Sequence, residues 1–127
     1  MPQNVHHFAK DNSKTNVLLL ISSISGAGAE LVVANLCRNI NRHHFNVSVC
    51  HLKERGEKGE KLLSEGYDIV ALPVLKQKKK NYFSFLSLRR LLIEKDIHIL
   101  HSHDSASFFD CASAKLIFPK VKTLHTF

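Results

Sequence analysis

The chain has 127 residues, of which 44% are hydrophobic and 23% are charged. This length suits one globular domain with its own core and excludes a second domain of ordinary size. The 18 basic and 11 acidic side chains give a formal charge of +7, so we expect anionic partners such as phosphates, acidic membrane surfaces or nucleic acid.

The N-terminal part of the chain is polar. Residues 1–15 are expected to form a flexible leader, ahead of a single domain over residues 16–127. The leader contains no apolar h-region, and the apolar run 17–21 is too short to span a bilayer. We therefore expect a cytoplasmic protein.

The three cysteines are far apart in the sequence and show no CxxC spacing; they are Cys37, Cys50 and Cys111. Their odd number and wide separation argue against both a disulfide framework and a metal site. We interpret them as reduced, buried residues that behave as small hydrophobic side chains.

Beyond the leader, apolar runs typical of strands alternate with amphipathic stretches typical of helices. The segments predicted as strands are 17–21, 47–52, 69–72, 97–100 and 121–126. The segments predicted as helices are 29–42, 57–65, a stretch that ends at about 95, and 105–117. Gly66 is expected to end the second helix and Pro119 the fourth. The inner side of the third helix is expected to carry Phe85, Leu88, Leu91 and Leu92. This alternation predicts an α/β fold: a Rossmann-like three-layer α/β/α domain with a parallel sheet of about five strands, in the order 3-2-1-4-5.

Small residues follow the first predicted strand, at Gly26, Ala27 and Gly28. Glycines there allow close approach of the backbone, and the N-terminus of the next helix offers N–H groups to a phosphate. The spacing matches neither GxGxxG nor a P-loop, so a phosphate site and an ordinary tight turn both stay open. Glu30 could be a first-turn acidic residue favoured by the helix dipole, but this interpretation is left open.

The fourth predicted strand runs into His101, His103, Asp104 and Ser105. In α/β folds ligands bind beyond the carboxyl ends of the strands. Histidines two residues apart on a strand point to the same side and could share a metal ion, but no third ligand accompanies them. We favour one histidine as a support of the strand end and the other as a cleft residue. Asp104 or Ser105 is expected to be the N-cap of the next helix, and a direct role of Asp104 in the site stays open.

A basic segment with aromatic neighbours precedes and enters the third predicted helix. Its cations are Lys78, Lys79, Lys80, Arg89 and Arg90. Such a pattern fits an anionic membrane surface, with nucleic acid less favoured, or a solvated loop that leads into a packed helix.

These motifs, in this order, resemble the N-terminal domain of the GT-B glycosyltransferases of family 4, also described as group 1. The resemblance covers about residues 16–127 and rests on segments 21–30, 33–36, 50–56, 96–103 and 124–126. It implies an enzyme of two Rossmann-like domains with the active site between them, in which the N-terminal domain binds the acceptor.

The resemblance also implies roles for individual residues. Gly28 and Gly26 would lie by the diphosphate of a nucleotide-sugar donor. Asp104 is expected to bind the substrate or the diphosphate together with them. His103 would be the catalytic residue at the cleft, near the transferred sugar, and His101 a strand-end support. Sugar transfer with retention of configuration is implied, with no metal and no other cofactor.

Residues 1–127 contain no donor-binding domain of the kind that this family carries. We therefore expect an incomplete enzyme, inactive alone, that meets the nucleotide-sugar through a missing C-terminal domain or a second chain. Its acceptor is expected to be lipid-linked or part of a cell-surface polysaccharide, which fits a position at the inner face of the cell membrane. Two alternatives stay open: a non-enzymatic Rossmann-like module that binds an anionic ligand or partner, and a metal-dependent hydrolase built around His101 and His103.

Overall fold

Five parallel strands form the centre of the computed structural model, which describes residues 13–24, 28–53, 55–72 and 84–126. The strands are β1 (Thr15–Ile21), β2 (Phe45–His51), β3 (Asp68–Ala71), β4 (Ile99–Ser102) and β5 (Lys122–His125). Their order is β3-β2-β1-β4-β5, so the predicted sheet order is confirmed.

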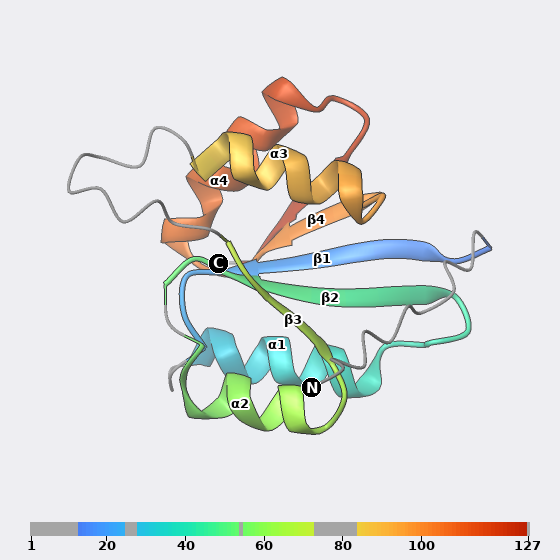
Figure 1. Cartoon of the computed structure of the whole chain (residues 1–127), viewed down its shortest axis with the longest axis vertical. Helices are drawn as coiled ribbons and strands as arrows, with labels where there is room; N and C mark the ends of the chain where they lie inside the picture. The colour runs from blue at the N-terminus through green and yellow to red at the C-terminus, as the bar shows by residue number, and fades with distance from the viewer. Residues whose placement is uncertain (1–12, 25–27, 54, 73–83, 127) are drawn as a thin grey trace, which may run out of the picture.

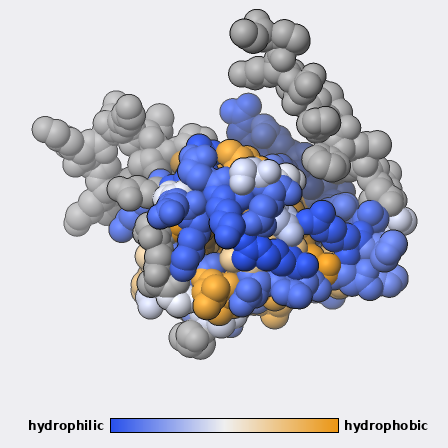
Figure 2. Space-filling view, turned by 90° about the horizontal axis from the view of Figure 1, so that it is seen from below, coloured by the Kyte–Doolittle hydropathy of each residue, from blue (hydrophilic) through white to orange (hydrophobic). Residues whose placement is uncertain are grey.

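Four helices cover the two faces of this sheet. They are α1 (Gly28–Asn39), α2 (Gly56–Ser64), α3 (Ser84–Glu94) and α4 (Ser105–Ile117). Figure 1 shows α1 and α2 below the sheet and α3 and α4 above it. The predicted Rossmann-like α/β/α architecture is therefore confirmed. Seen from the α1/α2 side, the described surface is mostly hydrophilic (Figure 2).

The central strand, β1, explains why its sequence is a continuous apolar run. Leu18 and Leu20 face one core, with α3 and α4, whereas Leu19 and Ile21 face the other, with α1 and α2. A strand buried on both faces has no solvent side on which polar residues would alternate.

Most element boundaries differ from those predicted by one to three residues, and two of these differences have a clear local cause. The first helix ends at Asn39 rather than at 42, because the side chain of Asn41 accepts a hydrogen bond from the N–H of His43 (2.9 Å) and starts a turn. The fourth strand is shifted from 97–100 to Ile99–Ser102. Ile97 is still buried, but its N–H bonds to the carbonyl of Leu92 at the end of α3, so ladder pairing begins two residues later.

The three cysteines are free and buried, as predicted. Burial raises the pKa of the Cys37 thiol to about 11 and that of Cys50 to about 12. Burial also raises the pKa of Cys111. Since the thiolate is the reactive form, these side chains are inert packing residues at neutral pH.

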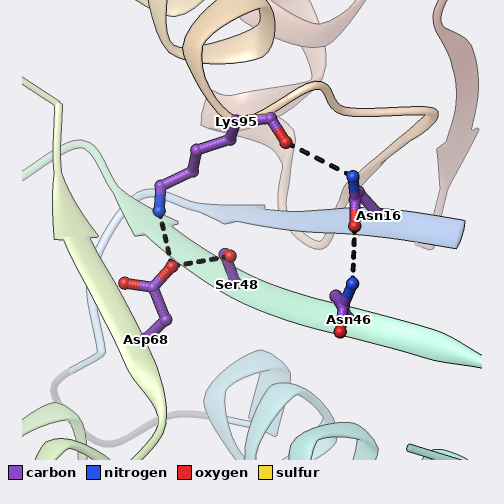
Figure 3. A network of polar contacts seen from close by, with 5 residues as sticks. All are labelled: Asn16, Asn46, Ser48, Asp68 and Lys95. Carbon is purple, nitrogen blue, oxygen red and sulfur yellow. Dashed lines mark hydrogen bonds and ion pairs between the residues drawn. The ribbon is translucent and has the colours of Figure 1, made fainter. Parts of the chain in front are cut away.

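Polar side chains tie the amino-terminal half of the sheet together (Figure 3). Asn46 Nδ2 donates to Asn16 Oδ1 (2.9 Å), and Asn16 Nδ2 contacts the carbonyl of Lys95 (3.5 Å). Lys95 Nζ in turn lies 2.6 Å from Asp68 Oδ2, which also accepts from Ser48 Oγ (2.8 Å). Each of these five residues takes part in a contact within the protein, so the network joins neighbouring elements of the fold.

Candidate functional site

The carboxyl ends of β1, β2 and β4 lie at one edge of the sheet, because the strands are parallel and adjacent. The segments that follow these strands bond to one another there. The carbonyl of Ser22, just after β1, accepts from the N–H groups of Leu52 (3.1 Å) and Lys53 (2.7 Å), which follow β2. The N–H of His103, just after β4, donates to the carbonyl of Leu20 (3.0 Å). These segments form the candidate site.

Asp104 is the N-cap of α4, as the capping interpretation predicted. Its Oδ1 accepts from the N–H of Ser107 (2.8 Å), and its Oδ2 accepts from both the N–H (2.8 Å) and the hydroxyl of Ser22. Burial raises the pKa of this carboxyl, but the hydrogen bonds from Ser22 and Ser107 outweigh burial, so its pKa lies below the ordinary value. Asp104 is therefore ionised at neutral pH. A role in binding substrate or diphosphate stays a prediction.

The ring of His103 is the most unusual group at this edge. His103 is 4% exposed, and within the described part of the chain neither ring nitrogen has a hydrogen-bond partner. Burial and the neighbouring His101 lower its pKa to about 4, against the opposing effect of Asp104. The ring is therefore neutral at physiological pH, with one donor and one acceptor nitrogen. A buried polar group without a partner is costly, and such groups often serve a function.

His103 and His101 point to the α1/α2 face of the sheet. His101 pairs in register with Leu19, which packs in the α1/α2 core, and the two histidine rings lie 4.0 Å apart. His101 Nε2 lies 2.8 Å from Thr126 Oγ1, just beyond β5. That contact joins β4 to the residue that follows β5, and the role of His101 as a strand-end support stays a prediction. Burial and then His125 lower the pKa of His101.

The N-terminus of α1 begins at the same edge. Gly28 is the first helical residue and is exposed, and a Cβ atom added there would meet nothing within 4 Å. Packing within the described protein therefore does not require a glycine at this position. Glu30 is buried in the first turn of α1. Gly26 lies outside the described residues.

Sequence reasoning missed His51, which ends β2. It is 6% exposed, its Nδ1 lies 3.4 Å from the carbonyl of Lys53, and it pairs in register with Ile21. Burial lowers its pKa. The rule that selected His103, a polar residue at the carboxyl end of a predicted strand, could also have found His51.

Two of the predicted cationic contacts, Arg89 and Arg90, are not part of this edge. Arg89 and Arg90 lie on α3, in the α3/α4 layer, whereas His103 points to the opposite face. Both arginines are exposed, and Arg90 Nε lies 2.7 Å from Glu94 Oε1. Lys78, Lys79 and Lys80 lie outside the described residues.

The described residues also bear on a metal site and on a membrane-spanning helix. No three or more His, Cys, Asp or Glu side chains among them gather as a metal ion would require. Within the same part of the chain, no helix is both long enough and apolar enough to cross a bilayer.

The depressed pKa of His103 predicts a pH-dependent stability. The unfolded chain binds a proton near pH 6.5 and the folded chain only near pH 4, so stability falls as the pH falls through this interval. The loss attributable to His103 is at most about 3 kcal/mol. The pKa values of His101 and His51 are also lowered, so these residues give stability the same pH dependence. A variant of His103 is therefore needed to isolate its contribution. Urea unfolding from pH 4.5 to 7.5 should give a distinctly flatter profile for His103→Leu than for the wild type. Parallel profiles would contradict the assigned environment of His103.

Comparison with models of protein families gives a match. The family model described as Glycosyltransferase Family 4 matches residues 26–127, which include Gly28, His103 and Asp104. No curated protein and no solved structure matches the chain.

Proposed function

The chain belongs to glycosyltransferase family 4, and from this membership we propose that it is the acceptor-side domain of an enzyme that transfers a sugar from a nucleotide-sugar. One observation carries the proposal: the neutral, buried ring of His103, whose nitrogens have no partner among the described residues, at the carboxyl edge of the sheet. That edge is where α/β domains bind ligands.

The chemistry of His103 suits a sugar hydroxyl. A neutral imidazole presents one N–H donor and one acceptor nitrogen, which match the donor and acceptor capacity of a hydroxyl group. A phosphate would instead favour cationic donors. We therefore assign His103 to the hydroxyls of the transferred sugar, as the catalytic residue at the cleft, with His101 behind it.

The start of α1 suits the other half of a nucleotide-sugar. The N-terminal N–H groups of a helix carry partial positive charge, and Gly28 adds no side chain that would keep a ligand at a distance. We assign this end of α1 to the diphosphate, whose charge grows as the sugar leaves. The nucleotide itself would bind a second Rossmann-like domain, in the same polypeptide or in a separate chain.

An NMR titration tests this assignment. Nucleotide-sugars with different bases, and free monosaccharides, are added while the ring Cε1–H signal of His103 and the amide signal of Gly28 are followed. We expect a sugar ligand to shift the His103 signal and a diphosphate to shift the Gly28 signal. If neither signal responds to any of these ligands, the proposal is wrong. Ligand binding without sugar transfer, even with a donor-binding domain supplied, would favour the non-enzymatic module.

We further propose that α3 contacts an anionic membrane, where a lipid-linked acceptor would reside. Leu86 (49% exposed) and Ile93 (48% exposed) lie on the same side of α3 as Arg89 and Arg90, at helical spacing. Exposed apolar residues mixed with cations are typical of helices that lie at a membrane interface. The lysines 76 and 78–80 precede this helix in the sequence.

Vesicle binding tests the membrane contact. Arg89→Gln with Arg90→Gln should weaken binding to phosphatidylglycerol-containing vesicles by about thirtyfold, because each cation near such a surface contributes about 1 kcal/mol. Lys58→Gln with Lys61→Gln removes the same charge from α2, on the other side of the sheet, and should change binding far less. Equal losses in the two double variants would indicate a non-specific charge effect and contradict an α3 contact.

A further inference from the structure

The carboxylate of Asp104 has more hydrogen bonds than a helix cap requires. Capping α4 uses only Oδ1, which accepts from the N–H of Ser107. Oδ2 lies outside the capping interaction and accepts from both the N–H and the hydroxyl of Ser22, 82 residues earlier in the chain. Capping therefore accounts for the hydrogen bond of Oδ1 alone. The hydrogen bonds between Oδ2 and Ser22 need a separate explanation.

Ser22 is held on both of its backbone groups. Its N–H is bound by Asp104, and its carbonyl is bound by the N–H groups of Leu52 and Lys53. Ser22 lies between the end of β1 and Gly28, the first residue of α1. Whatever fixes Ser22 therefore fixes the point from which the chain runs to the start of α1.

At its own end of the contact with Ser22, Asp104 lies next to the site histidine in the chain. Asp104 directly follows His103, whose N–H bonds to the carbonyl of Leu20 two residues before Ser22. The His103 ring is buried, and its nitrogens have no partner among the described residues, which is the ground on which the proposed function assigns the sugar to this end. One carboxylate thus links the two segments to which the sugar and the diphosphate are assigned.

We propose that Asp104 is a positioning residue of the site: its carboxylate holds the segment after β1, and with it the start of α1, in a fixed arrangement relative to His103. The proposal rests on the proposed function, because it concerns ligands at those two segments. Asp104 does not contact the ligand in this role, and its charge stays paired with donors from Ser22 and Ser107.

Two variants separate positioning from capping. Asp104→Asn keeps the shape but replaces one acceptor oxygen by an NH2 group, so the side chain can no longer accept from Ser22 and Ser107 together. Ser107→Ala removes the hydroxyl that accepts from the N–H of Asp104 (3.3 Å) and donates to its carbonyl (3.1 Å), which is the reciprocal half of the capping box, and it leaves both bonds to Ser22 in place. If Asp104 only stabilised the fold, changes in amide exchange and in ligand binding would follow the loss of thermal stability in both variants.

The first measurement needs no ligand. Amide hydrogen exchange at Ser22 should be about tenfold faster in Asp104→Asn, because the N–H loses a charged acceptor, and within about twofold of the wild type in Ser107→Ala. The His103 ring signal should move in Asp104→Asn alone. Equal behaviour of the two variants, or unchanged exchange at Ser22 in Asp104→Asn, would overturn the positioning role.

The second measurement uses inorganic pyrophosphate as the probe, followed at the amide of Gly28. We expect Asp104→Asn to bind it about tenfold more weakly and Ser107→Ala to bind it like the wild type, even at an equal loss of melting temperature. Wild-type affinity in Asp104→Asn would overturn the proposal. Absence of pyrophosphate binding in the wild type would instead contradict the diphosphate assignment, and the exchange measurement would then decide the positioning role alone.

Discussion

Replacing His103 with leucine is expected to stabilise the fold and abolish recognition of the sugar ligand. The ring is 4% exposed, and no described residue bonds to its nitrogens, so an apolar side chain removes the cost of burying them. That cost is about 1–3 kcal/mol, and we expect a gain of about 1 kcal/mol in the free energy of unfolding at pH 7. Urea unfolding measures the gain, and the NMR titration measures the loss of binding.

His101→Leu is the matched control. It removes a histidine two residues away, but one whose Nε2 contacts Thr126 Oγ1 at 2.8 Å. Losing that contact should lower the stability by about 1 kcal/mol. The two leucine variants should therefore change stability in opposite directions. A destabilised His103→Leu would show that the ring stabilises the fold, and it would remove the main argument for a ligand at this position.

Leu20→Ala is expected to give the largest loss of stability. Leu20 is fully buried on the central strand and packs in the core beneath α3 and α4. Truncating such a leucine costs about 2–5 kcal/mol, through lost burial and the cavity left behind. Small domains have a total stability of about 5–15 kcal/mol, so a large part of it should disappear. Denaturation in urea, monitored by circular dichroism, gives the value.

Leu31→Ala provides the comparison for that change. Leu31 lies on α1 and is 53% exposed, so the same truncation should cost well under 1 kcal/mol. Similar losses of unfolding free energy in Leu20→Ala and Leu31→Ala would contradict the expectation that the core on the α3/α4 side contributes most of the stability.

Most of the fold was predictable because it depends on local pattern. The apolar run of β1 indicates a strand covered on both faces, and Gly66, at φ 91°, ends α2 where a left-handed residue is needed. The predicted bounds of α4 coincide with the observed Ser105–Ile117, since Asp104 and Pro119 flank that helix. The shifted start of β4 was not predictable, because it depends on where β1 and β5 allow pairing.

The location of the candidate site follows from the sequence pattern, but its geometry does not. The carboxyl end of the fourth strand pointed to His103, and the spacing of the two histidines indicated a shared face. Whether the His103 ring would be buried without partners depends on side-chain packing, which strand periodicity does not describe. The bond between Asp104 and Ser22 joins residues 82 apart and follows from the register of β1 with β4. His51 was overlooked, although its position at the end of a strand was visible in the sequence.

The central position of β1 has a consequence for synthesis of the chain on the ribosome. Asn16 pairs with His98, which lies 82 residues later, so β1 is made long before its neighbour on one side exists. At about 5–20 residues per second, that edge of β1 waits roughly 4–16 s for β4 to emerge. An apolar strand with an unpaired edge is prone to mispairing during this interval. The most buried strand of the finished domain is thus the one whose edge waits longest for its partner while the chain is being made.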